Sequence, residues 1–135
     1  MTKRSKAILF ALFFVLLAAA PLWPLLARSR APRELVIVAR QMAFHSEDKA
    51  GDNPVIRVTP GERLRVTLVN DDLGVTHDLA VSGWALTTPA LRGNDRASIV
   101  VSVPDTPGTF EYVCSMHPAL MRGTIEVAGA TVPNQ

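Results

Sequence analysis

The chain has 135 residues, which is enough for one globular domain and a short appendage but too few for two domains. Its formal net charge of +2 comes from the N-terminal end, because residues 34–128 contain eight Lys and Arg against twelve Asp and Glu and therefore carry −4. A nucleic-acid-binding protein needs a basic face, and a mildly acidic domain offers none, so we expect no nucleic-acid partner.

An apolar segment lies near the N-terminus. Residues 7–27 contain no charged side chain and follow a short basic start. The pattern predicts one N-terminal hydrophobic helix that serves as a signal peptide or as a membrane anchor. Pro21 and Pro24 shorten the uninterrupted helix to the length of a signal-peptide core, whereas Pro21 is a poor first residue after a cut and prolines are tolerated in membrane helices. We favour contact with the membrane through residues 7–27 and a periplasmic or extracytoplasmic domain.

The remainder of the chain predicts one β domain. Residues 28–33 are typical of a tether, 34–128 form the domain, and 129–135 form a C-terminal tail. Seven short apolar and β-branched segments predict strands, and turns rich in Gly, Pro, Asn or Asp separate them. The expected strands are 35–39, 55–59, 62–69, 78–82, 98–103, 110–113 and 124–127, and the turns are 60–61, 70–74, 104–108 and 122–123. This arrangement predicts an all-β fold, an antiparallel sandwich of two sheets.

The polar segment 45–53 follows the first expected strand. It contains a glycine and shows no alternation of apolar and polar residues, so it predicts a loop. Met42 and His45 are expected to be surface or packing residues rather than parts of a site.

One loop concentrates side chains that bind metals. Cys114 is the single cysteine and cannot form an internal disulfide. It follows an expected strand and is succeeded by His117 and Met121, so one loop offers a thiolate, an imidazole and a thioether. A thiolate with two imidazoles and a weak methionine donor suits one copper ion that cycles between Cu(I) and Cu(II). We expect His77, which lies between a turn and a strand, to supply the second imidazole, so the predicted metal ligands are His77, Cys114, His117 and Met121.

These segments resemble the cupredoxins, the small blue copper proteins. The resemblance is carried by residues 107–118, Pro-Gly-Thr-Phe-Glu-Tyr-Val-Cys-Ser-Met-His-Pro, and by Asn70-Asp71 followed by His77-Asp78. It covers roughly residues 34–128 and implies a Greek-key sandwich that carries single electrons with the four ligands named above. The spacing between His117 and Met121 differs by one residue from that in part of the family. Of the four ligand assignments, this difference affects only that of Met121 as the axial ligand.

The resemblance also implies roles for residues around the ligands. Asp78 stands where many members have Asn, and we expect it to bond to the Ser115 hydroxyl across the two loops. The edge of His117 is expected near the surface, where a redox protein partner docks. The expected apolar docking patch consists of Gly74, Val75, Met116, Pro118, Ala119 and Leu120.

Other functions fit the sequence less well. Cys114 as a nucleophile with His117 as its base would need an oxyanion loop and a residue that orients the imidazole, so we expect neither an enzyme nor a small-molecule substrate. Three histidines are too few for a second copper site, and a single cysteine is too few for a binuclear copper centre. The alternative that stays open is a periplasmic copper carrier or chaperone that delivers the ion without transferring electrons.

Overall fold

The computed structural model describes residues 31–129. The predicted N-terminal helix, the first part of the tether and nearly all of the tail fall in residues 1–30 and 130–135, outside the described part. Within residues 31–129, no helix is long and apolar enough to cross a membrane.

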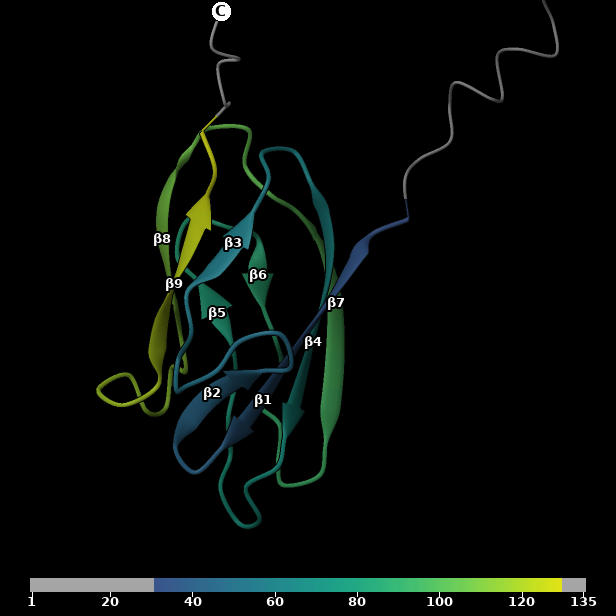
Figure 1. The fold of residues 1–135 in the computed structure, drawn as a ribbon. Coiled ribbons are helices and arrows are strands. Elements are labelled where there is room, and N and C mark those ends of the chain that lie inside the picture. Colours follow the sequence, from purple (N-terminus) through teal and green to yellow (C-terminus); the bar gives the residue numbers. More distant parts are fainter. Residues whose placement is uncertain (1–30, 130–135) are drawn as a thin grey trace, which may run out of the picture. The chain divides into compact units, whose positions relative to one another are not determined.

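Over residues 31–129, nine strands form two sheets (Figure 1). The four-stranded sheet has the order β2-β1-β4-β7, and the five-stranded sheet has the order β3-β9-β8-β5-β6. The strands are β1 (Arg33–Arg40), β2 (Ala43–Ser46), β3 (Ile56–Val58), β4 (Arg63–Asn70), β5 (Ala80–Val81), β6 (Leu86–Thr87), β7 (Arg96–Ser102), β8 (Gly108–Val113) and β9 (Arg122–Val127). Each of the seven expected segments overlaps one of these strands, so the all-β prediction is confirmed for residues 31–129.

The two unexpected strands are β2 and β6. β2 pairs with β1 in an antiparallel hairpin whose two-residue turn is Gln41-Met42. The expectation of a loop over 45–53 was therefore wrong at its start, since His45 and Ser46 belong to β2. β6 is a two-residue strand at the edge of the second sheet, too short to give a periodic signal in the sequence.

The sheets are mixed, which corrects the expectation of an antiparallel sandwich. β1 pairs with β4 in parallel, and β3 pairs with β9 in parallel. Between β1 and β4 the chain passes through β2 and then through β3 of the other sheet, so β4 returns to β1 by a crossover instead of a hairpin. Alternation of apolar residues indicates which face of a strand is buried and carries no information about strand direction.

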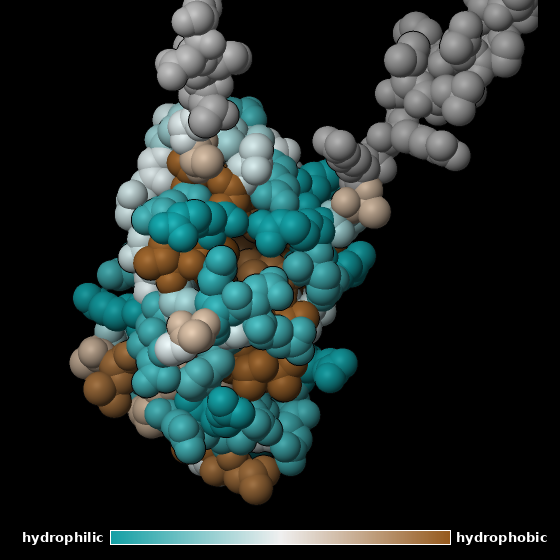
Figure 2. All heavy atoms as spheres, viewed as in Figure 1, coloured by the Kyte–Doolittle hydropathy of each residue, from teal (hydrophilic) through white to brown (hydrophobic). Residues whose placement is uncertain are grey.

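The core lies between the two sheets. Leu35, Ile37 and Ala39 of β1 are buried, while the residues between them are only partly covered. The same alternation places Leu64, Val66 and Leu68 of β4 in the core. Burial of one large apolar side chain contributes about 1.5–3 kcal/mol, so this two-sided core holds the strands and the loops that connect them. Hydrophilic side chains cover most of the face seen in Figure 2.

Gly123 has a different role from the one the sequence suggested. Residues 122–123 were expected to form a turn, but both belong to β9. Gly123 lies opposite Tyr112 of β8, and a Cβ atom at this position would come within 2.2 Å of the Tyr112 ring. The Tyr112 hydroxyl donates a hydrogen bond of 2.7 Å to the Pro54 carbonyl. Gly123 therefore leaves the space that lets the tyrosine ring cross β9.

Candidate metal centre

Two loops carry the predicted ligands. Residues 71–79 connect β4 to β5, and residues 114–121 connect β8 to β9. Both loops lie in the lower half of the domain in Figure 1, so segments far apart in the chain come together there.

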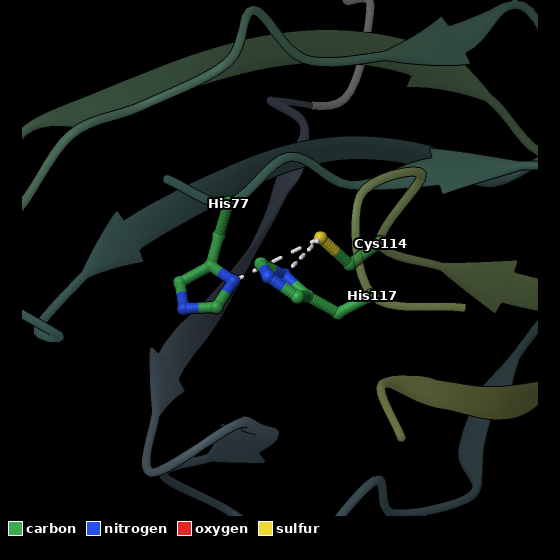
Figure 3. Close-up of side chains that lie close together, drawn as sticks. All are labelled: His77, Cys114 and His117. Atoms are coloured by element: carbon green, nitrogen blue, oxygen red, sulfur yellow. Dashed lines mark hydrogen bonds between the residues drawn. The ribbon is translucent and has the colours of Figure 1, made fainter. Parts of the chain in front are cut away.

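Three of the four predicted ligand side chains converge. The Sγ atom of Cys114 lies 3.8 Å from Nδ1 of His77 and 3.7 Å from Nδ1 of His117. The donor atoms of all three residues lie within 4.8 Å of one another. In Figure 3 the side chains point toward a common space, His77 from one segment and the other two from the loop after β8. Two imidazole nitrogens and one sulfur therefore face one another without any rearrangement.

The spacing of these donors fits a trigonal metal site. Metal–sulfur bonds of about 2.3 Å and metal–nitrogen bonds of about 2.0 Å, taken from zinc, a first-row divalent ion, put sulfur and nitrogen about 3.7 Å apart at a bond angle of about 120°. A tetrahedral angle with the same bonds gives about 3.5 Å. The observed sulfur–nitrogen distances of 3.7 and 3.8 Å match the trigonal case. A histidine–histidine–cysteine trigonal donor set is the one that copper electron-transfer sites use.

His77 is held by the backbone on both sides. Its N–H donates to the Leu91 carbonyl at 3.0 Å, and the Leu91 N–H donates to the His77 carbonyl at 2.8 Å. The amide of the buried Asn70 donates to the carbonyls of Val75 and Leu91 at 2.8 Å each. Both the residue and its loop are thus fixed to the end of β4.

Gly93 lets a neighbouring turn approach this loop closely. A Cβ atom at position 93 would lie 2.9 Å from the Asp72 carbonyl oxygen and 2.9 Å from Cα of Leu73. Both contacts are to backbone atoms that cannot yield easily, so glycine permits the close packing of the loop that carries His77.

The loop of Cys114 is closed by its own hydrogen bonds. The Cys114 N–H donates to the Met121 carbonyl at 2.9 Å, and the Met121 N–H donates to the His117 carbonyl at 2.9 Å. Cys114 and Met121 are both fully buried, while His117 is partly exposed. Met121 is therefore adjacent to the cluster through its backbone and lies within the core.

Asp78 links the two loops, with a different partner group from the expected one. Its Oδ1 atom accepts a hydrogen bond of 2.6 Å from the backbone N–H of Ser115. The sequence had suggested the Ser115 hydroxyl as the donor. A backbone donor fixes the path of the chain directly after Cys114, so Asp78 positions the thiol-bearing residue.

Asn53 braces the loop of Cys114 from the other side. Its side-chain oxygen accepts from the Phe44 N–H at 3.0 Å, and its side-chain nitrogen donates to the Leu120 carbonyl at 2.9 Å. Asn53 ends the polar segment 45–53, which the sequence predicts to be a loop. That segment thus connects β2 to the candidate metal centre.

Asp72 is a residue of the site that sequence reasoning missed. Its Oδ2 atom lies 3.0 Å from Nε2 of His77. Burial alone would raise the pKa of Asp72, but hydrogen bonds from the Gln41 and Met42 backbones and from His77 outweigh it, so the pKa lies below its ordinary value. The sequence showed only a turn-rich Asn-Asp-Asp run, because the partners of Asp72 come from a hairpin that the sequence did not reveal.

Exposed apolar residues lie on the two loops that carry His77 and His117. Leu120 is 59% exposed, Met116 41% and Leu73 75%. Of the expected patch residues, Gly74, Pro118 and Ala119 are also exposed and Val75 is partly covered. Hydrophobic groups are visible at the lower edge of the domain in Figure 2, where both loops lie.

Comparison with known proteins identifies the fold. No protein-family model matches the chain, and no curated protein matches it. Auracyanin A from Chloroflexus aurantiacus, described as a blue copper protein, has 19% identity and a TM-score of 0.59, over 73% of this chain and 100% of its own. Rusticyanin from Thiobacillus ferrooxidans has 21% identity and a TM-score of 0.53, over 70% of this chain and 76% of its own.

A third structural match is a chain of a heme-copper terminal oxidase. It has 18% identity and a TM-score of 0.57, and the match covers 93% of this chain and 100% of the oxidase chain. At these identities the comparisons show a shared fold. The resemblance to the cupredoxins inferred from the ligand loop thus extends to the architecture of the whole domain.

Proposed function

We propose that this chain is an exported or membrane-anchored type 1 copper protein that carries single electrons between redox partners. One copper ion would be held by Nδ1 of His77, Nδ1 of His117 and Sγ of Cys114, with Met121 as a weak axial donor. The observation that carries the proposal is the convergence of two imidazole nitrogens and one thiol at trigonal spacing. Likeness in fold to rusticyanin and auracyanin A supports it.

The residues of this chain would supply preorganisation. When bound, the copper ion supplies a one-electron couple. His77 and Cys114 are fully buried and exclude water from the donor atoms. Hydrogen bonds from both loops hold these side chains at fixed spacing, so little rearrangement accompanies a change of oxidation state.

Electrons would leave and enter through His117. It is the one partly exposed residue of the three convergent donors, and Leu73, Met116 and Leu120 lie exposed on the same two loops. An exposed apolar surface of this kind suits a transient interface with a redox protein. The apolar segment 7–27 supports a periplasmic or extracytoplasmic location at the membrane surface.

Colour and reversible bleaching test the proposal. The purified full chain, loaded with Cu(II), should absorb strongly at about 600 nm, the energy of a thiolate-to-copper transition in such a donor set. Ascorbate should remove the colour and an oxidant should restore it. A matched Zn(II)-loaded sample should stay colourless.

A colourless complex that binds copper but does not respond to ascorbate would contradict the electron carrier. That result would instead support a copper carrier or chaperone, in which the same side chains hold the ion for delivery. Failure of the chain to bind copper at all would overturn both functions.

A further inference from the structure

Asp72 contacts the imidazole of His77 at the nitrogen that does not face Cys114. Oδ2 of Asp72 lies 3.0 Å from Nε2 of His77, while Nδ1 of the same ring lies 3.8 Å from Sγ of Cys114. The Asp72 side chain is 17% exposed and that of His77 is fully buried. The ring is thus placed between a carboxylate and a thiol.

The hairpin turn between β1 and β2 holds this carboxylate in place. The Gln41 N–H donates to Oδ1 of Asp72 at 2.7 Å, and the Met42 N–H donates to Oδ2 at 3.2 Å. Gln41 and Met42 have φ values of 55° and 61°, in the left-handed region that non-glycine residues rarely adopt. Two consecutive residues in this conformation cost on the order of 1–3 kcal/mol each and persist only where surrounding contacts determine them. The strained turn therefore aims two backbone donors at Asp72.

A carboxylate that accepts from Nε2 determines the tautomer of the histidine. An ionised carboxylate has acceptor atoms only, so the proton of this hydrogen bond must reside on Nε2 of His77. A neutral imidazole with its proton on Nε2 has a free lone pair on Nδ1. That lone pair points to the same space as the Cys114 sulfur, where a metal ligand needs it.

We propose that Asp72 is a positioning residue that fixes His77 as the Nε2–H tautomer and places a fixed negative charge behind the metal centre. Because an anion favours the more positively charged oxidised ion over the reduced one, Asp72 lowers the reduction potential of the site. The part of this inference that concerns the reduction potential rests on the proposed function. The part that concerns the tautomer of His77 does not, because it applies to the metal-free protein.

The tautomer is measured on the metal-free wild-type chain. Nitrogen-15 NMR of the imidazole at pH 8 should show the proton of His77 on Nε2 and none on Nδ1. A neutral ring with its proton on Nδ1 would overturn the inference. This measurement needs no substitution and no copper, so it is decisive even if a variant folds poorly.

The potential is measured on two charge-matched variants of the copper-loaded full chain. Asp72→Asn keeps the size of the side chain and removes its charge, and Asp71→Asn removes the same charge from the adjacent, exposed residue. Asp72→Asn should weaken Cu(II) binding about 10–100-fold, the usual cost of losing a partner of a metal-bound histidine, and Cu(I) binding by less. Each tenfold difference between the two losses raises the potential by about 59 mV for one electron. Asp71→Asn should change the Cu(II) and Cu(I) affinities by only a small fraction of the loss expected for Asp72→Asn.

The outcomes separate this inference from the proposed function. Equal shifts of the reduction potential in both variants, or no shift in either, would overturn the role of Asp72. The proposed function would still be supported if the copper-loaded protein is coloured and redox-active. A chain that binds no copper would overturn the proposed function and with it the effect on the potential, and the NMR result would still decide the tautomer. A larger shift for Asp72→Asn, with the Nε2–H tautomer in the wild type, supports the inference.

Discussion

Cys114 provides the one soft donor of the convergent cluster, and its substitution separates folding from metal chemistry. Cys114→Ser replaces the sulfur with a hydroxyl of similar shape at a fully buried position. We expect the intense colour with copper to disappear, because a hard hydroxyl does not form the thiolate bond. The free energy of unfolding of the metal-free variant should lie within about 1–2 kcal/mol of the wild-type value, since the new hydroxyl has two imidazoles as hydrogen-bond partners. Absorption spectra and urea unfolding would measure both, and retained colour would contradict the assignment.

The sulfur of Met121 is the proposed axial donor, and a second methionine offers a matched control. Met121→Leu should keep the colour and raise the reduction potential by about 60 mV or more, because a weak donor to copper is removed. This shift corresponds to a loss of Cu(II) affinity that is about tenfold or more greater than the loss of Cu(I) affinity. Leu and Met have similar volumes, so the fold should tolerate the change at a cost below about 1.5 kcal/mol. Met116→Leu alters an exposed methionine of the same loop. A shift produced by Met116→Leu and not by Met121→Leu would reassign the axial donor.

The sequence predicted which side chains converge but not what surrounds them. His77, Cys114 and His117 could be chosen because their donor chemistry and their places beside strands limit the options. Asp72 could not be chosen, because its partners depend on a turn with no glycine or asparagine to reveal it. Asp78 was chosen with the right neighbour, but the donor is the Ser115 backbone, a choice that depends on local chain direction.

The close packing of strands β8 and β9 at Gly123 can be tested by substitution of this single glycine. Gly123→Ala would bring a Cβ atom within 2.2–2.6 Å of the Tyr112 ring, so the ring has to move and its hydrogen bond to Pro54 is strained. We expect the free energy of unfolding to fall by about 3 kcal/mol, the upper end of the range for overpacking. Thermal or urea unfolding of the metal-free chain would measure it.

Gly129→Ala is the control for that substitution. No atom lies within 4 Å of a Cβ placed at Gly129, so the same added methyl group should leave stability within about 0.5 kcal/mol of the wild type. Equal stability of the two variants would show that the Tyr112 ring does not depend on the space at Gly123.

The elements that the sequence missed share a physical cause. β2 follows a turn of Gln41 and Met42, whose left-handed backbone is stabilised by a distant carboxylate and not by the residues themselves. β6 contains only Leu86 and Thr87, so neither alternation nor length could distinguish it from a loop. In contrast, β1, β4 and β7 are long enough for their apolar period to be read directly.

The whole domain is tied together by pairings between distant parts of the chain. The parallel pairs β1–β4 and β3–β9 join segments that no hairpin connects, such as Ile56 with Ile125. The sequence could indicate the positions and buried faces of seven of the nine strands within residues 31–129, and the family resemblance could indicate a sandwich. Strand order and direction arise from how the whole chain packs, so local patterns could not supply them.

One ion pair at the start of this architecture predicts a dependence of stability on pH. Arg33 of β1 donates a hydrogen bond to Glu62, directly before β4, and this bond, with one from the Thr59 backbone, holds the pKa of Glu62 below its ordinary value. A lowered pKa means that the folded state favours the ionised carboxylate, so the contribution to stability is present above the unfolded pKa of about 4.3. It is lost as the pH falls through the lower pKa of the folded state.

Glu62→Gln measures this contribution in the metal-free chain. At pH 7 the variant should be less stable than the wild type by less than about 1 kcal/mol, because both partners of the ion pair are partly exposed. The difference should vanish at low pH, where Glu62 is protonated in the wild type. Glu47→Gln, which removes an exposed carboxylate elsewhere, is the charge-matched control and should change the stability at pH 7 by no more than about 0.5 kcal/mol. A constant difference for Glu62→Gln at all pH values would contradict the assignment.

The unequal burial of the three convergent donors has a consequence for maturation of the protein. His77 and Cys114 are enclosed, and only His117 among the three reaches solvent, beside Met116 and Leu120. Under the proposed function, an incoming ion has to pass the side on which a partner protein would later sit. If that partner covers His117 as proposed, loading would have to precede engagement with the partner, and a seated partner would shield the ion from chelators.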